Sequence, residues 1–125
     1  MKGTGTILLV DDENMVLGVG KEMLERIGYK VLLATNGMEA VQIYRKHKDE
    51  IDLIILDMIM PEMGGGETYD QIKEDSPKVK VLLASGYSVN GKATEILKRG
   101  CNCFIQKPFN MKELSGRIRE VLDNE

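Results

Sequence analysis

The 125-residue sequence has little of what zinc-thiolate, disulfide-rich and nucleic-acid-binding proteins require. It contains two Cys, one His, three Pro and no Trp, which are too few thiols and imidazoles for a structural zinc site or a disulfide scaffold. Positive charge is scarce as well, with 17 Lys and Arg against 20 Asp and Glu and a net charge of −3. Because phosphate backbones and anionic lipid surfaces attract basic faces, we expect neither nucleic acid nor a membrane among the partners of this chain.

Long hydrophobic runs are also missing. Runs such as Ile7–Val10 and Leu53–Leu56 are far shorter than the roughly 20 apolar residues that cross a bilayer, and Met1–Gly5 lacks the features of a signal peptide. The length suits one domain with a core of two or three layers. The sequence therefore predicts a single cytoplasmic domain over residues 1–125, in which Cys101 and Cys103 are packing residues rather than metal ligands.

Short runs of β-branched residues and Leu recur along the chain. They are mostly apolar on both faces, which is typical of parallel strands that helices cover on both sides. These runs are Thr6–Val10, Lys30–Ala34, Leu53–Leu56, Val79–Ala84 and Cys103–Ile105.

Segments with a helical period separate these runs. In the first segment we expect one apolar face made by Met15, Val16, Val19, Met23, Leu24 and Ile27. In the last we expect a capping pair, Asn110 with Glu113, and inward side chains at Met111, Leu114, Ile118, Val121 and Leu122. Two stripes between them are shorter, with Ala40, Ile43, Tyr44 and His47 in one and Ala93, Ile96 and Leu97 in the other. The segment after Gly66 has only Tyr69 and Ile72 as apolar anchors. Five strands alternating with five helices predict a doubly wound α/β sheet.

Polar side chains lie at the ends of four of the predicted strands. They are Asp11 and Asp12 after the first strand, Asp57 after the third, Ser85 after the fourth and Lys107 after the fifth. In open parallel sheets the carboxyl ends of the strands form the ligand site, so we expect these groups to converge. Crowded carboxylates repel one another, and their oxygens suit Mg²⁺ better than zinc. The sequence therefore predicts a magnesium site at this edge.

Each of these residues also has a plainer interpretation. Asp11 and Asp12 could cap the following helix, Asp57 could be an ordinary strand-end residue, Ser85 could be a turn hydroxyl, and Lys107 could be solvated. Four strand ends would then have to place complementary groups on one edge by chance. We therefore favour a common site.

A second pattern points to another class of protein. Gly86–Lys92 matches the G-x-x-x-x-G-K pattern of phosphate-binding loops, and Leu53–Asp57 is similar to the metal-binding strand of nucleotide hydrolases. However, Ala93 stands where the metal-binding hydroxyl should follow, and the Asp strand precedes the loop. We therefore disfavour a nucleotide hydrolase.

Over essentially its whole length, the sequence resembles the receiver domain of two-component response regulators. The resemblance is carried by Leu8–Glu13, Leu56–Met63 with Gly65, Leu83–Tyr87, Gly100 and Phe104–Phe109. It implies a flavodoxin-like sheet of five parallel strands in the order 2-1-3-4-5 with five helices. It also implies a partner that donates a phosphoryl group, either a histidine kinase or a His-containing phosphotransfer domain.

The resemblance assigns the acceptor and the metal ligands. Asp57 would accept the phosphoryl group. Asp12 and Asp57 would contact Mg²⁺ directly, Asp11 would do so through water, and the main-chain carbonyl of Ile59 would supply a further oxygen.

It also assigns the groups that respond to phosphorylation. Ser85 would bond to the phosphoryl group, Lys107 would pair with it, and Phe104 would be the switch aromatic that moves with Ser85. The Lys107–Pro108 bond is cis in this family. The switch would act on the face made by the fourth helix, the fifth strand and the fifth helix.

Several positions set this chain apart within the family. Gly64–Gly66 replaces a polar helix cap, so the first turn after it should be looser. Ile59 and Tyr87 stand where side chains tune hydrolysis of the phosphorylated state, and both are largely apolar. The lead-in Lys2–Thr6 and the loop Ser85–Ser88 resemble receivers of hybrid histidine kinases. Since no output segment follows Glu125, we expect either a free-standing regulator or, by preference, a receiver excised from such a kinase.

Two functions are consistent with these residues. The favoured one is a signalling module that catalyses only its own phosphorylation and dephosphorylation. The alternative is a small Mg²⁺-dependent phosphohydrolase, which would need a second acid near Asp57 to protonate a leaving group. The apolar Ile59 stands where some phosphatases of this type carry that acid.

Overall fold

The computed structural model describes residues 5–58, 63–85, 103–107 and 109–123. Five strands form one parallel sheet in the order β2-β1-β3-β4-β5, which confirms the flavodoxin-like arrangement. The strands are β1 (Thr6–Val10), β2 (Lys30–Ala34), β3 (Ile51–Asp57), β4 (Val81–Ser85) and β5 (Cys103–Gln106).

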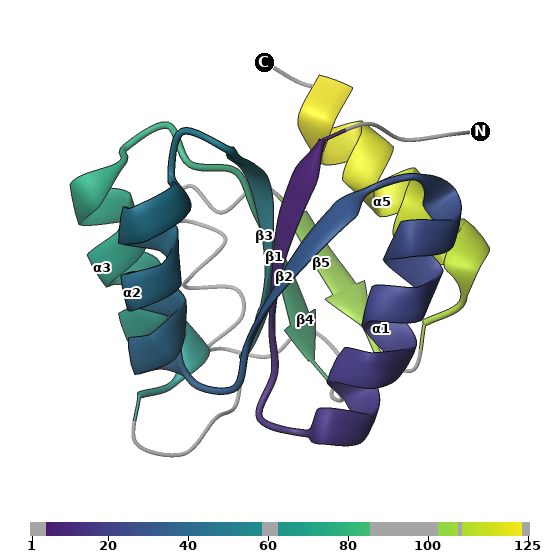
Figure 1. Ribbon diagram of the computed structural model, residues 1–125, viewed down its shortest axis with the longest axis horizontal. Helices are drawn as coiled ribbons and strands as arrows, with labels where there is room; N and C mark the ends of the chain where they lie inside the picture. The colour runs from purple at the N-terminus through teal and green to yellow at the C-terminus, as the bar shows by residue number, and fades with distance from the viewer. Residues whose placement is uncertain (1–4, 59–62, 86–102, 108, 124–125) are drawn as a thin grey trace.

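Helices cover both faces of this sheet. They are α1 (Asn14–Ile27), α2 (Gly37–His47), α3 (Gly65–Asp75) and α5 (Met111–Asp123). Helices α2 and α3 lie on one face and α1 and α5 on the other (Figure 1). The described part of the chain thus has four helices rather than the five expected, and the helix predicted around 93–97 lies outside it. None of the described helices is long and apolar enough to cross a membrane.

The alternation of strand side chains explains the two-sided core. One set of strand residues packs under α2 and α3, namely Leu8, Val10, Ile54, Leu56, Val81 and Leu83. The alternate set packs under α1 and α5, namely Ile7, Leu9, Leu53, Ile55, Leu82 and Ala84. Because successive side chains in a strand point to opposite faces, a sheet buried on both sides needs uninterrupted apolar runs.

The inward face of α1 differs from the expected one. Its buried residues are Leu17, Gly20, Leu24 and Ile27. Met15 is 80% exposed and Val19 is 49% exposed, so the prediction that both belong to the buried face is wrong. A Cβ on Gly20 would lie 2.7 Å from Leu9 Cδ2, so the helix approaches β1 through a residue without a side chain. In α5, Met111 is likewise exposed, whereas Leu114, Ile118 and Val121 are buried as expected.

The first turns of the helices are held in different ways. In α2, the Asn36 side chain accepts a hydrogen bond from the Glu39 N–H at 2.8 Å. In α5, the Asn110 side chain accepts a hydrogen bond from the Glu113 N–H at 2.8 Å, which confirms the predicted capping pair. Helix α3 begins after Gly64, which provides no side-chain cap, in agreement with the expectation for three consecutive glycines.

The two edges of the sheet are occupied differently. Strand β1 begins, and helix α5 ends, at one edge (Figure 1). The carboxyl ends of all five parallel strands lie at the opposite edge, where the predicted site residues follow.

Candidate functional site

The site lies where the strand order of the sheet reverses. Strand β1 pairs with β2 on one side and with β3 on the other, and ligands of such sheets bind outside this switch point. Backbone pairing continues past the strand ends: the N–H groups of Asp11 and Met58 donate to the carbonyls of Ala34 and Ala84 at 3.1 Å and 2.9 Å. The sheet therefore holds the main chain as far as the Met58 N–H.

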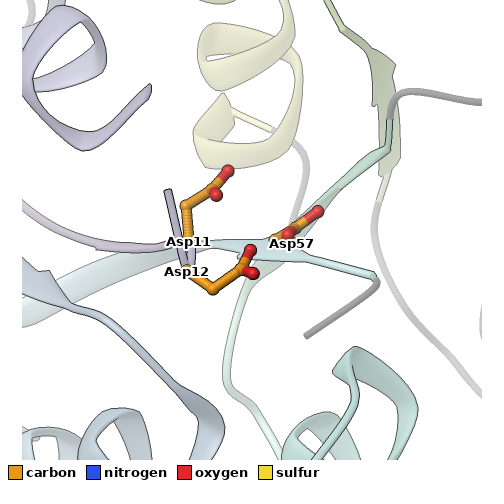
Figure 2. Close-up of side chains that lie close together, drawn as sticks. All are labelled: Asp11, Asp12 and Asp57. Atoms are coloured by element: carbon orange, nitrogen blue, oxygen red, sulfur yellow. The ribbon is translucent and has the colours of Figure 1, made fainter. Parts of the chain in front are cut away.

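Three carboxylates converge at this point. One oxygen from each of Asp11, Asp12 and Asp57 lies within 4.8 Å of the others (Figure 2). Asp11 and Asp57 are buried, with 2% and 6% of their surface exposed, whereas Asp12 is exposed. The convergence predicted from the strand ends is present.

Asp11 shapes the chain that leaves β1. Its Oδ1 accepts a hydrogen bond from the Glu13 N–H at 2.9 Å. The residue that precedes α1 is Glu13, and it makes no side-chain capping bond. Asp11 therefore closes a local turn, and the plainer interpretation of Asp11 as the cap of this helix is wrong.

Lys107 is enclosed by the same carboxylates. Its ammonium donates to Asp11 Oδ2 and, at 3.2 Å, to Asp57 Oδ1, and only 16% of its side chain is exposed. Its backbone N–H donates to the Ser85 carbonyl at 2.7 Å, which extends the pairing of β5 with β4. The interpretation of Lys107 as a solvated lysine is therefore wrong.

Lys107 offsets only part of the destabilisation of the charged Asp57 carboxylate. Burial, with the charges of Asp11 and Asp12, raises the pKa of Asp57 from 3.8 to about 6 against the opposing effect of Lys107. Burial alone would lower the pKa of Lys107. The hydrogen bond with Asp11 and the charges of both buried carboxylates outweigh burial, so the pKa of Lys107 is raised. An additional cation beside Asp57 would relieve the remaining repulsion, and the all-oxygen donor set fits a hard dication such as Mg²⁺.

Ser85 and Phe104 lie on neighbouring strands. Ser85 ends β4 and is 2% exposed, so it is a buried strand-end residue rather than a turn hydroxyl. Phe104 on β5 pairs with Leu83 and is half-buried against the core that also contains α2 and α3.

Ile59, Tyr87 and Pro108 lie outside the described residues, as do Cys101 and the loop 86–92. Cys103 packs against the core under α1 and α5, as expected for a packing residue.

A groove beside the site was missed by the sequence analysis. It is lined by Glu13, Met15, Val16, Val19, Gly20, Met23, Lys107 and Phe109. The signal was present, because the apolar positions of α1 outnumber those that one buried face can hold. We call this surface the α1 groove.

Comparison with known proteins identifies the family. The profile described as "Response regulator receiver domain" matches residues 7–119. The chain belongs to the response regulator receiver family. Receiver domains are signalling modules of two-component systems, so the resemblance stated from sequence is confirmed at this level.

Relatives of this receiver include parts of longer proteins. The sensor kinase CckA of Brucella abortus is 32% identical over 125 residues, which are 100% of this chain and 13% of that protein. The probable transcriptional regulator ycf27 of Cyanidium caldarium is 37% identical over 116 residues, which are 93% of this chain and 45% of that protein. The receiver therefore spans less than half the length of either relative.

Solved structures share the same architecture. A receiver domain protein of Clostridium thermocellum superposes with a TM-score of 0.91 at 30% identity, covering 95% of this chain and 94% of that one. A CheX-CheY complex with BeF3 and Mg²⁺ from Borrelia burgdorferi contains a chain with a TM-score of 0.89 at 27% identity, covering 94% of this receiver and 88% of that chain.

Proposed function

We propose that residues 1–125 form a single receiver domain that accepts a phosphoryl group on Asp57 from a phosphohistidine and acts as a phosphorylation-dependent switch. The donor would be a histidine kinase or a His-containing phosphotransfer domain. The observation that carries the proposal is the placement of Asp57, a buried carboxylate in contact with Lys107 and beside Asp11 and Asp12. The likeness to a sensor kinase supports a donor of this class.

The transfer is a displacement at phosphorus. A carboxylate oxygen of Asp57 attacks phosphorus, an O–P bond forms and the N–P bond of the phosphohistidine breaks, and the imidazole leaves as a neutral ring that takes up a proton from water. The transition state is loose, so positioning and charge neutralisation provide most of the catalysis. Lys107 is already 3.2 Å from Asp57 Oδ1, where its charge can stabilise the transferred group.

The same residues would hold Mg²⁺. Asp12 and Asp57 would bind it directly, Asp11 would bind through water, and the main-chain carbonyl of Ile59 would complete the protein ligands. When bound, the ion supplies positive charge against the phosphoryl oxygens. The clustered oxygens and the raised pKa of Asp57 support a cation site here.

Phosphorylation would change the face that contains β5 and α5. The aspartyl phosphate would add a charge of about −1.5 to −2, by analogy with other phosphorylated side chains. Ser85 would move to bond with the phosphoryl group, and Phe104 would occupy the space that Ser85 leaves. Their positions on adjacent strands support this coupling.

The α1 groove is suited to the donor protein. It is largely apolar, it includes the exposed side chains of Met15 and Val19, and Lys107 of the site forms part of it. A helix that presents a phosphohistidine to Asp57 has to lie over this edge of the sheet. We infer that the donor docks against the α1 groove.

Intact-mass spectrometry tests the acceptor. After incubation with acetyl phosphate and Mg²⁺, the wild type should gain the mass of one phosphoryl group and Asp57→Asn should gain none. Asp49→Asn, an exposed carboxyl change elsewhere, should behave like the wild type. Labelling of Asp57→Asn to the wild-type extent would overturn the assignment. Rapid release of phosphate far beyond one equivalent would favour a phosphohydrolase instead.

A further inference from the structure

We propose that Gly37 and Thr68 form a steric clamp between α2 and α3 that positions the backbone after Asp57 and so sets the affinity of the site for Mg²⁺. Thr68 is thus a positioning residue on the face of the sheet away from α1. The inference rests on the proposed function, because it concerns the same metal site.

The start of α3 touches the backbone of the acceptor. The Gly65 N–H donates to the Met58 carbonyl at 2.9 Å. A Cβ on Gly65 would lie 2.6 Å from the Asp57 carbonyl oxygen and 2.7 Å from Met58 Cα. The Gly65 backbone thus lies too close to Asp57 and Met58 for any side chain at position 65, so a shift of α3 should move the main chain at Asp57 and Met58.

Thr68 ties the first turn of α3 together. It is completely buried, and its hydroxyl donates to the Gly64 carbonyl at 2.9 Å. The Thr68 N–H donates to the same carbonyl at 3.0 Å. Since Gly64 has no capping side chain, Thr68 fixes the segment that lies against Asp57.

Gly37 makes room for Thr68. A Cβ on Gly37 would lie 2.1 Å from Thr68 Oγ1 and 3.0 Å from both Cγ and the carbonyl oxygen of Met63. A side chain at position 37 would therefore displace α3 and the residues that lead into it.

The displacement would fall on α3 because α2 is the better anchored helix. Asn36 accepts from the Glu39 N–H at 2.8 Å, and Glu39 Oε1 accepts from the Thr35 N–H at 2.9 Å. These two bonds hold the first turn of α2 against the segment that precedes it. Helix α3 lacks a side-chain cap, so a clash at Gly37 should move Thr68 and, through Gly65, the backbone at Asp57.

A double-mutant cycle tests the clamp, with Mg²⁺ affinity measured by isothermal titration calorimetry. Gly37→Ala should weaken Mg²⁺ binding at least fivefold. Thr68→Ala removes the atom that would clash and also the hydroxyl bond to Gly64, so alone it should weaken Mg²⁺ binding about twofold. Adding Gly37→Ala to Thr68→Ala should cause little further loss, because the clashing atom is already absent. Additive effects of the two changes would overturn the proposal.

Glycine variants elsewhere provide matched controls. A Cβ on Gly18 or Gly116 would meet no atom within 4 Å, so Ala at either position should leave Mg²⁺ binding unchanged. Gly20→Ala would clash with the side chain of Leu9, which lies on the face of the sheet covered by α1 and α5. It should lower the thermal stability without weakening Mg²⁺ binding, which separates general destabilisation from positioning.

Two further outcomes keep the test decisive. If Gly37→Ala does not fold, Thr68→Ile enlarges the same contact from the α3 side and should weaken Mg²⁺ binding at least threefold, and wild-type affinity in Thr68→Ile would overturn the clamp. If the wild type itself binds no Mg²⁺, the metal site of the proposed function is wrong. Binding by the wild type with equal affinity in Gly37→Ala would instead refute only the clamp.

Discussion

Lys107 reaches across β4 to Asp57, with its ammonium nitrogen 3.2 Å from Asp57 Oδ1 although β4 separates their strands. The same ammonium bonds to Asp11, so one lysine serves two buried carboxylates. The charge of Lys107 does not offset the burial of Asp57 and the charges of Asp11 and Asp12, so the pKa of Asp57 is still raised to about 6. The metal-free receiver therefore holds an ionised Asp57 at a cost in stability.

Asp57→Asn should stabilise the metal-free receiver. An acid whose pKa is raised on folding, here from 3.8 to about 6, destabilises the folded state once it ionises, so the penalty is complete above pH 6 and absent below about pH 4. Removing it at pH 7.5 should increase the free energy of unfolding by about 1–2 kcal/mol. The gain should shrink as the pH falls towards 4.

Urea unfolding in a chelating buffer at several pH values measures this effect. Asp49→Asn, which changes an exposed carboxyl, should follow the wild type at each pH. A gain for Asp57→Asn that does not depend on pH would show that ionisation of Asp57 is not its origin.

Mg²⁺ should raise the melting temperature of the wild type, because a ligand that binds only the folded state stabilises it. Asp12 is exposed and belongs to the carboxylate cluster, so Asp12→Asn should fold normally and lose most of the Mg²⁺-dependent increase. Differential scanning fluorimetry with and without about 10 mM Mg²⁺ measures the increase in melting temperature of each protein. An equal increment in Asp12→Asn would remove this residue from the proposed ligands.

Ser85→Ala should uncouple phosphorylation from the switch. The acceptor remains, so acetyl phosphate should still label Asp57, whereas the hydroxyl that would move toward the phosphoryl group is gone. The chain has two Phe residues, so fluorine NMR of the fluorophenylalanine-labelled protein can follow Phe104, with Phe109→Leu providing the assignment. Phosphorylation should shift the Phe104 signal in the wild type and shift it much less in Ser85→Ala. The same response in both would contradict the role of Ser85.

Lys107→Ala should retain Mg²⁺ binding and should also lose the shift of the Phe104 signal on phosphorylation.

The phosphorylated state should be long-lived because Ile59 and Tyr87 offer no carboxylate or amide to orient water for attack. The double variant Ile59→Asn, Tyr87→Glu should lose its phosphoryl group several-fold faster. Its labelling by acetyl phosphate should change little. Decay after removal of the donor, followed by intact mass, measures both proteins. Equal or slower decay in the double variant would disprove the effect.

Val19→Lys should slow transfer from a protein donor at least tenfold and leave labelling by acetyl phosphate unchanged. Val19 is 49% exposed and lines the α1 groove, so a charge there opposes docking without disturbing the core. Met38→Lys is a matched control, because Met38 is 61% exposed at the start of α2 and is not part of the groove. Rates from a phosphorylated His-containing phosphotransfer domain measure the difference. Equal slowing by both changes would indicate a nonspecific charge effect.

Much of the fold and the site could be predicted because they follow from local sequence. Apolar runs identify strands buried on both faces, and parallel topology brings all of their carboxyl ends to one edge. The convergence of Asp11, Asp12 and Asp57 required no knowledge of packing. Even the missing cap of α3 could be predicted from Gly64–Gly66.

The features that could not be predicted depend on contacts between distant elements. The face that α1 buries is set by close approach to β1 at Gly20, and a hydrophobic pattern counts glycine as neutral. The contact of Gly37 with Thr68 joins residues on two helices, and no local periodicity contains it. The convergence of Lys107 with Asp11 was expected from the parallel strand ends, but which carboxylates the ammonium contacts depends on the order of the strands in the sheet.

The separation of the two edges of the sheet bears on how this receiver can be joined to other proteins. Strand β1 starts and α5 finishes at one edge of the sheet (Figure 1), whereas Asp57 ends β3 at the opposite edge. Fluorescent proteins, affinity tags or neighbouring domains fused before β1 or after α5 would thus be attached at the edge of the sheet opposite Asp57. The route by which a donor histidine approaches would stay open, so fused receivers should retain the phosphotransfer rates of the isolated domain.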